Sequence, residues 1–144
     1  MTKFLVDTNV LSEFSRTGSP DQRVRNWLDG VPSDSLYVSV LTLAEIRRGI
    51  EMLPAGRRRQ QLQHWLESDL VASFTDSNVL SVSRAVADRW AVISVQAQQR
   101  GIQTSIIDGL VAATALEYGL TVATRNVKDF AGLAVEIFNP WISR

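Results

Sequence analysis

Short apolar runs of β type alternate along this chain with segments of helical spacing, and no other feature constrains the fold as strongly. The runs occupy residues 3–6, 36–40, 120–123 and 135–138. Strands that alternate with helices form right-handed βαβ units, because a parallel neighbour is reached only through a crossover connection. The sequence therefore predicts a three-layer α/β domain with a parallel sheet at its centre.

Three segments between these runs have the apolar spacing of helices. In residues 43–53 the apolar positions are three, four and three residues apart, and one face of the predicted helix is apolar. Residues 106–116 are apolar on almost every side, as in a helix buried in a core. The longest segment has an apolar stripe formed by Val79, Val82, Val86, Trp90, Ile93 and Ala97.

The chain has 144 residues, of which 45% are hydrophobic and 21% charged, as in an ordinary globular domain. We therefore expect one domain over residues 1–144. The longest stretches without charge, residues 35–44 and 90–99, have ten residues each, too few to cross a bilayer. The apolar start, residues 4–6, is also too short for a signal peptide. The sequence predicts a cytoplasmic protein without a membrane segment.

Few residue types are available for metal binding or nucleophilic chemistry. The chain has no cysteine and one histidine, His64, to which we assign no role. A disulfide framework, a thiolate zinc site and a site with several histidines are therefore excluded. Any metal ion must be bound by oxygen ligands.

Four acidic residues stand near the ends of the predicted strands or in the helices that follow them. They are Asp7, Glu45, Asp108 and Asp129. In parallel α/β folds the carboxyl ends of the strands form one edge, where ligands bind. The four carboxylates are therefore expected to converge at that edge.

Each acid also has a structural interpretation when it is taken alone. Asp7 can cap the helix that follows it, and Ser105 with Asp108 matches a capping box. Glu45 can pair with a nearby arginine on its helix, and Asp129 can be a turn residue. Convergence of all four is harder to explain by structure alone, because unpaired carboxylates repel one another unless a cation binds or their pKa values rise.

Oxygen ligands without cysteine indicate Mg²⁺, with Mn²⁺ as a substitute. Mg²⁺ held by carboxylates is typical of phosphoryl transfer and nuclease chemistry. Residues 47–59 contain five arginines against Glu51 alone, a net charge of +4 in a chain whose formal net charge is zero. Arg47 and Arg48 are candidates for contacts with the flanking phosphates of a nucleic acid. The alternative is a solvated helical face without a ligand.

Four motifs and a short closing motif follow one another along the chain. Together they resemble the PIN-domain ribonucleases of the VapC/FitB toxin group over nearly the whole chain. The resemblance implies a three-layer α/β/α PIN-like domain with a central parallel sheet, and an endoribonuclease that hydrolyses RNA phosphodiester bonds with a metal-activated water. The motifs are Phe4-Leu5-Val6-Asp7-Thr8-Asn9-Val10-Leu11, Leu43-Ala44-Glu45-Ile46-x-x-Gly49, Ile107-Asp108-Gly109-Leu110-Val111-Ala112-Ala113-Thr114-Ala115, Thr124-Arg125-Asn126-x-x-Asp129-Phe130 and Asn139-Pro140-Trp141.

The resemblance also implies a set of site residues. Asp7, Glu45 and Asp108 are the metal-binding and catalytic acids, and Asn126 or Asp129 completes the site. The family's fourth acid position is here the amide Asn126, so Asp129 is the substitute candidate both as a metal ligand and as a catalytic acid. Contacts with the RNA are assigned to Thr8, Arg47, Arg48, Thr124 and Arg125.

One further position departs from the family pattern, because Gly109 stands where alanine is more usual. We expect this change to affect packing only.

The resemblance implies partners as well. Members of the group act with a small antitoxin that has a DNA-binding domain, so we expect a homodimer that forms a higher assembly with its antitoxin. The apolar stripes of the two predicted helices are candidates for the dimer contact, and the alternative is that both stripes face the sheet. A basic side chain of the antitoxin is expected among the acids, where it would relieve their repulsion.

Two other classes of function remain open from the residues. A haloacid-dehalogenase-like phosphatase also begins with an apolar strand and an aspartate, but it needs a second aspartate where this chain has Asn9. A non-catalytic RNA-binding or receiver-like module would use the acids only as helix caps. Binding of Mg²⁺ or Mn²⁺ would distinguish convergent carboxylates from dispersed caps.

Overall fold

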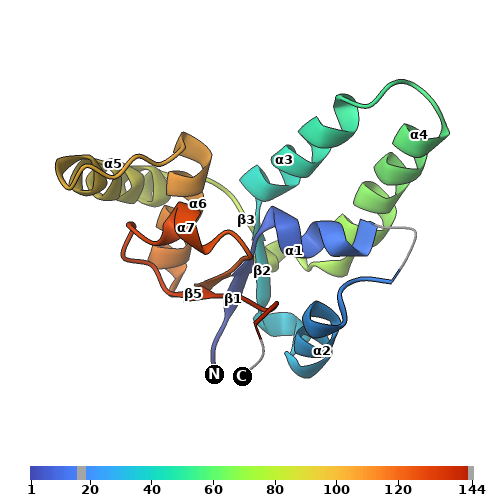
Figure 1. Cartoon of the computed structure of the whole chain (residues 1–144), viewed down its shortest axis with the longest axis horizontal. Coiled ribbons are helices and arrows are strands. Elements are labelled where there is room, and N and C mark those ends of the chain that lie inside the picture. The colour runs from blue at the N-terminus through green and yellow to red at the C-terminus, as the bar shows by residue number, and fades with distance from the viewer. Residues whose placement is uncertain (16–18, 143–144) are drawn as a thin grey trace.

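The sheet at the centre of the molecule has five strands in the order β3-β2-β1-β4-β5 (Figure 1). The computed structural model describes residues 1–15 and 19–142. Every neighbouring pair of strands is parallel, so the carboxyl ends of all five lie at one edge. The parallel sheet predicted from the sequence is confirmed. The strands are β1 (Phe4–Val6), β2 (Leu36–Ser39), β3 (Val79–Leu80), β4 (Thr121–Ala123) and β5 (Ile137–Phe138).

Helices cover both sides of this sheet. Figure 1 shows α5 and α6 on one side and α1, α2 and α3 on the other, which confirms the α/β/α layers. The α-helices are α1 (Thr8–Ser12), α2 (Gln22–Gly30), α3 (Val40–Glu51), α4 (Arg57–His64), α5 (Arg84–Gln99), α6 (Ile106–Tyr118) and α7 (Val127–Phe130). Short 3₁₀ turns occupy Glu13–Ser15, Ser33–Ser35, Val71–Ser73 and Asp76–Asn78, and a π-helical turn covers Trp65–Leu70.

The two faces of the sheet bury separate hydrophobic clusters. Leu5 of β1 belongs to the cluster that contains α5 and α6, together with Val122 of β4. Its neighbour Val6 belongs to the other cluster, with Val38 of β2 and the inner faces of α1 and α3. Successive strand residues point to opposite faces, so β1 contributes to both cores. The helices that follow the strands are thereby fixed around the carboxyl edge.

The segment at 79–97 is not one helix, and this part of the prediction is wrong. Val79 and Leu80 form β3, which pairs with β2. Helix α5 begins only at Arg84, after Ser83 caps it by accepting a hydrogen bond from a backbone N–H of the first turn. A buried strand of two residues leaves too short a pattern to be distinguished from a helix by spacing.

The other boundaries differ from the predictions by a few residues. Ser39 caps α3 by accepting a hydrogen bond from the N–H of Leu41, so Val40 is helical and the second strand ends earlier. The apolar segment at 106–116 is α6, with six buried residues, and this prediction is confirmed. Gly119 ends α6 in the left-handed conformation, at a φ of 67°. None of the helices in residues 1–15 and 19–142 combines the length and the hydrophobicity that a membrane span requires.

Candidate active site

A cleft of about 330 Å³ opens where β1 and β4 end. All four acids predicted from the sequence line it, and they come from the starts of α1 and α6, from α3 and from α7. No lining residue is basic, so the fully ionised cleft has four negative charges. The lining residues are Asp7, Thr8, Asn9, Glu45, Ser105, Asp108, Asn126 and Asp129.

Asp7 both caps a helix and lines the cleft. One carboxylate oxygen accepts a hydrogen bond from the N–H of Thr8 at 2.9 Å, which caps α1. The other accepts from the hydroxyl of Thr124 at 2.8 Å and from the amide of Asn9 at 3.3 Å. The capping interpretation is therefore confirmed, and the same three donors hold the side chain, which is only 7% exposed, in one orientation.

Thr124 is fully buried and does not line the cleft. Its hydroxyl donates to Asp7 and accepts from the side chain of Asn9 at 3.1 Å and from the N–H of Asn126 at 3.0 Å. The structure thus shows Thr124 holding the carboxylate of Asp7, and the expected contact of Thr124 with RNA stays a prediction.

Asn9 is a site residue that the sequence reasoning missed. Besides its contacts with Asp7 and Thr124, its side-chain oxygen accepts a hydrogen bond from the N–H of Arg125 at 3.0 Å. It therefore joins the turn after β1 to the turn after β4. The run Asp7-Thr8-Asn9 could have indicated Asn9 as a site residue, but helix capping explains that run equally well.

Glu45 is half-buried on α3 and accepts a hydrogen bond from the hydroxyl of Thr8 at 3.2 Å. Burial raises the pKa of Glu45, and the negative charges of Asp7 and Asp108 raise it further, while the bond from Thr8 acts in the opposite direction. In the described part of the chain Glu45 has no ion pair, so the surface pair with an arginine that was the alternative interpretation is absent.

Asp108 lies in the first turn of α6, and its N–H donates to the hydroxyl of Ser105 at 3.1 Å. The predicted capping contact is therefore present. Burial raises the pKa of Asp108, as do the charges of Asp129 and Asp7, and a hydrogen bond with Ser105 opposes the rise. The raised pKa values of Glu45 and Asp108 share a cause, since carboxylates have gathered in a partly dehydrated space.

Asn126 and Asp129 are exposed at the start of α7, where the N–H of Asp129 donates to the carbonyl of Asn126 at 3.1 Å. Both line the cleft. Both candidates for the remaining ligand position therefore lie in the same cleft as Asp7, Glu45 and Asp108.

The donors of the cleft fit a hard divalent cation, because all of the side-chain groups named for metal binding offer oxygen. A cation would relieve the repulsion that raises the pKa values of Glu45 and Asp108. Among the described residues, no three acids are close enough together to chelate one ion. Mg²⁺ usually keeps several waters and takes only one or two carboxylates directly, so a spaced set of acids suits it.

The arginine-rich stretch lies outside the cleft. Arg47 pairs with Glu51 at 2.9 Å and with Glu67 at 3.5 Å, and Arg59 also pairs with Glu51. These ion pairs connect α3 with α4 and with the π-helical turn. Arg48 is exposed and does not line the cleft. Of the two arginines expected to contact phosphates, Arg47 is therefore paired with glutamates of the chain itself.

Gly109 follows Asp108 and lies against an indole ring. A Cβ at this position would be 2.9 Å from Cδ1 and Nε1 of Trp90, which is too close. Trp90 of α5 therefore takes the space that an alanine side chain would need. The contact is one of packing, as expected, and it sets how closely the first turn of α6 approaches α5.

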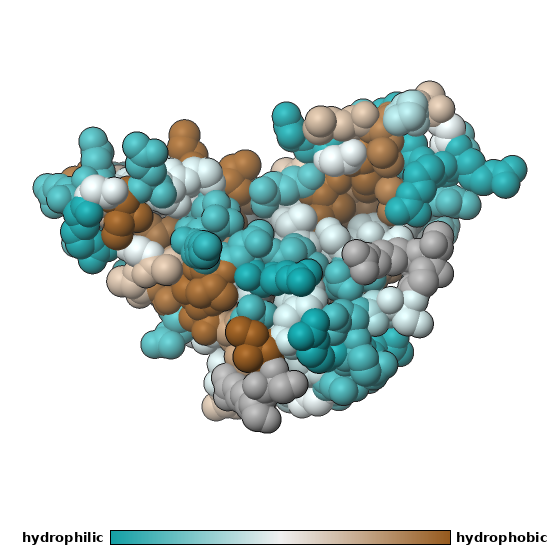
Figure 2. Space-filling model, in the orientation of Figure 1, coloured by the Kyte–Doolittle hydropathy of each residue, from teal (hydrophilic) through white to brown (hydrophobic). Residues whose placement is uncertain are grey.

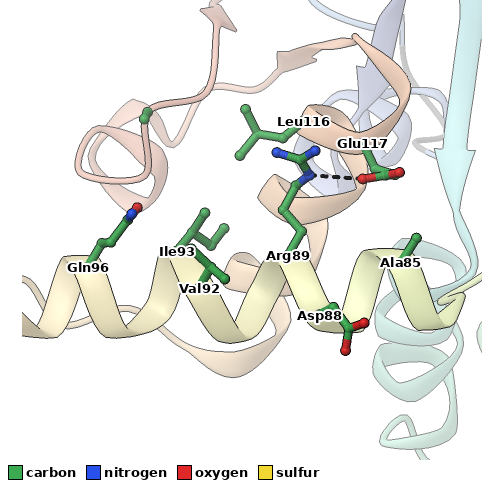
Figure 3. A pocket seen from close by; sticks show the side chains of 9 residues that line it. Ala85, Asp88, Arg89, Val92, Ile93, Gln96, Leu116 and Glu117 are labelled. Atoms are coloured by element: carbon green, nitrogen blue, oxygen red, sulfur yellow. Dashed lines mark hydrogen bonds and ion pairs between the residues drawn. The ribbon is translucent and has the colours of Figure 1, made fainter.

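A larger cavity, of about 560 Å³, lies between α5 and α6 (Figure 3). An ion pair of 2.9 Å between Arg89 and Glu117 lies in its wall. Val92 and Ile93 line the α5 side, and none of the predicted site residues belongs to it. Size alone therefore does not identify the functional site.

The apolar stripes considered for the dimer contact are buried in part in the two hydrophobic clusters. Val86, Ile93 and Ala97 of α5 are buried in one hydrophobic cluster. Ile46 and Ile50 of α3 are buried in the other. Trp90 and Leu43 of the same stripes are only partly buried, and Val82 is 38% exposed. The core therefore takes up part of each stripe, and the dimer contact stays a prediction.

Known proteins resemble this chain over nearly its whole length. The family profile of the PIN domain matches residues 4–135. The chain is 38% identical over 137 residues to Toxin FitB of Neisseria gonorrhoeae, which covers 95% of this chain and 97% of FitB. It is 36% identical over 137 residues to VapC ribonuclease Y4jK of Sinorhizobium fredii, with 95% and 96% covered.

Solved structures show the same likeness in three dimensions. The crystal structure of FitAcB from Neisseria gonorrhoeae superposes with a TM-score of 0.89 at 37% identity, over 97% of this chain and 99% of that one. The structure of FitAB bound to the IR36 DNA fragment gives a TM-score of 0.90 at 35% identity, over 98% and 97%.

Proposed function

The chain belongs to the PIN-domain family, and on this premise we propose that it is an endoribonuclease acting as the toxin of a toxin–antitoxin pair. One observation carries the enzymatic part, since four carboxylates from separate segments line one cleft without a basic residue. Capping accounts for Asp7 but not for Glu45, which lies inside α3. The names of two relatives, a toxin and a VapC ribonuclease, support the toxin part.

Asp7, Glu45 and Asp108 would hold Mg²⁺, or Mn²⁺ as a substitute, with Asn126 or Asp129 as a further ligand. When bound, such an ion neutralises charge on the reacting phosphate and activates water as the nucleophile. The lining residues include no cysteine or histidine that could attack in its place.

The protein's own contribution is to orient the acids before the RNA arrives. Three donors fix Asp7, the hydroxyl of Thr8 fixes Glu45, and a capped turn holds Asp108. Such outer contacts keep ligand oxygens in place and support catalysis.

Apart from the buried Thr124, the residues assigned to RNA contacts divide into three groups. Thr8 lines the cleft itself. Arg125 lines a neighbouring pocket, close enough to the acids to meet the same RNA. Arg47 and Arg48 lie outside both spaces and would contact only more distant phosphates.

A small antitoxin with a DNA-binding domain is the proposed partner, because a relative's complex, FitAB, is bound to DNA. Figure 2 shows hydrophobic side chains gathered in the hollow between α3 and α4. Leu43 and Leu62 on these helices are only partly buried. An amphipathic antitoxin segment would cover this surface, and a basic side chain beyond it would enter the acid cleft.

A homodimer remains a proposal, with a higher assembly on binding of the antitoxin and a cytoplasmic location. Its contact would use exposed side chains rather than the buried members of the stripes. Val92 and Val95 of α5 are 56% and 51% exposed, and Val92 also lines the larger cavity. Light scattering of the isolated protein at micromolar concentration should show a dimer, and a stable monomer would contradict this proposal.

The alternative functions are less well supported by the geometry. In place of the second aspartate of a haloacid-dehalogenase-like phosphatase, Asn9 donates hydrogen bonds to Asp7 and Thr124. A non-catalytic module would not explain why Glu45 and Asp129 line the same cleft as Asp7.

The purified chain should cut RNA in the presence of Mg²⁺ or Mn²⁺ and stop when EDTA is added. Titration with Mn²⁺ in a calorimeter should show binding that Asp108→Asn weakens and Glu67→Gln, outside the cleft, does not. Absence of both binding and cleavage would favour the non-catalytic module. Co-expression with a small neighbouring gene should give a complex in which cleavage is suppressed.

A further inference from the structure

A second pocket, of about 380 Å³, adjoins the acid cleft but has the opposite charge. Asn126 and Asp129 line both spaces, so the two share a wall. Arg125 and Lys128 give this second pocket two positive charges against the one negative charge of Asp129. We call it the α7 pocket, and its lining residues are Arg125, Asn126, Val127, Lys128, Asp129 and Asn139.

The guanidinium of Arg125 lies over the ring of Trp141, with Cζ 5.2 Å from the ring centroid. Trp141 is only 4% exposed, so the indole is a fixed support. The backbone N–H of Arg125 is also held, by the side chain of Asn9. Stacking covers one face of the guanidinium and leaves its N–H edges available for an anion.

The closing motif Asn139-Pro140-Trp141 builds the other side of this pocket. The side-chain oxygen of Asn139 accepts a hydrogen bond from the N–H of Trp141 at 2.9 Å. This contact orients the amide, and its nitrogen has no hydrogen-bond acceptor among residues 1–15 and 19–142. The motif thus supports Arg125 through the indole and adds a hydrogen-bond donor of its own.

Neither Arg125 nor Lys128 has an ion-pair partner in the described part of the chain. Other arginines, such as Arg47 and Arg89, pair with glutamates. Two exposed cations beside one pocket, one of them stacked and fixed, favour binding of an anion.

We propose that the α7 pocket binds a phosphate of the RNA that neighbours the phosphate placed at the acid cleft. Arg125 makes the bidentate contact, and Lys128 and Asn139 donate further hydrogen bonds. The inference rests on the proposed ribonuclease function, because an RNA must cross the cleft for its next phosphate to reach this pocket. Such a contact positions the strand without reading its sequence.

The test measures binding of a fluorescein-labelled single-stranded RNA of mixed sequence to the full chain in EDTA, over a series of salt concentrations. Arg125→Gln should weaken binding about fivefold and lower the slope of log K against log salt by about 0.7, the loss of one phosphate contact on a single strand. Lys128→Gln should act in the same direction. Arg25→Gln, which removes the same charge from α2, is the matched control and should change neither quantity.

Several outcomes would overturn the inference. If Arg125→Gln lowers the melting temperature but leaves the salt slope at the control value, the arginine only covers Trp141. If RNA binding is unchanged but capture of the co-expressed antitoxin weakens, the pocket serves a protein partner. RNA that binds with the predicted slope change but is never cut with Mg²⁺ or Mn²⁺ would contradict the nuclease function and leave the pocket in place.

Discussion

Charged side chains are gathered in two regions of the molecule. In one region they form ion pairs, and in the other they have the same sign and are unpaired. Between α3, α4 and the π-helical turn, Arg47 and Arg59 surround Glu51, and their hydrogen bonds lower the pKa of that glutamate. In the acid cleft no cation lies among the lining residues, and the pKa values of Glu45 and Asp108 are raised. Paired charges favour the folded state, whereas gathered like charges oppose it.

Glu45 and Glu51 make this comparison within one helix. They are the same residue type on α3, yet their pKa values shift in opposite directions. Helix position alone does not distinguish them, so their neighbours in space must. Because gathered like charges oppose folding, we expect the acid cleft to serve a ligand.

Removal of one acid from the cleft should have the largest effect. Asp108→Asn and Asp7→Asn should each reduce RNA cleavage by at least about a hundredfold, because an oriented charge at the reacting phosphate is lost. Gel-based cleavage rates with Mg²⁺ measure this, and Glu67→Gln is the control from the paired region. Full activity in both variants would show that the cleft is not the active site.

Stability in EDTA should separate these two variants. Asp108→Asn should melt no lower than the unmodified protein, since it removes repulsion from the cleft. Asp7→Asn should not gain in the same way, because an amide would turn its NH₂ group toward the N–H of Thr8 or toward the donors Thr124 and Asn9.

Loss of a positioning contact should have the next largest effect. Thr124→Val removes the hydroxyl that donates to Asp7, and cleavage should fall about 10- to 100-fold, as for other contacts that orient metal ligands. Thr124→Ser keeps the hydroxyl and should recover most of the rate. RNA affinity in EDTA should stay the same for both, and a parallel loss of affinity would argue for a direct contact with RNA.

The same substitution at two points of α3 should shift stability in opposite directions. Glu51→Gln breaks two ion pairs and should lower the melting temperature slightly, since exposed pairs contribute little. Glu45→Gln should raise it in EDTA, because a charged group leaves the cleft. Thermal melts at neutral pH and low salt compare them, and a lower melting temperature for Glu45→Gln would contradict the repulsion argument.

The smallest expected effect is on the pH dependence of stability. The folded protein holds the protons of Glu45 and Asp108 more tightly than the unfolded chain does, so stability falls as the pH rises from their ordinary pKa values through the raised ones. The advantage of Asp108→Asn in EDTA should therefore shrink as the pH is lowered through this range. Glu51 acts in reverse, because its stabilising contribution is lost as the pH falls below its ordinary pKa. Urea titrations at several pH values measure both trends.

Prediction from the sequence succeeded where a pattern was long. The parallel sheet followed from alternating runs, and α6 from a segment that is apolar on nearly every side. It failed at β3, because the two residues of this strand, Val79 and Leu80, are too few to show a hydrophobic periodicity. It also did not foresee that Arg47 pairs with Glu67, because this glutamate comes from a distant turn.

By itself the sequence determined the layered α/β class, the convergence of four acids and the restriction to oxygen ligands, because these depend on local periodicity and residue type. Only the tertiary structure decided which charges would be paired. Thr124 lies 117 residues from Asp7 in the sequence, yet it holds that carboxylate by a buried hydrogen bond. Contacts of this kind depend on the packing of β1 against β4 and of helices on both faces, and no local pattern in the sequence specifies which partner a side chain meets.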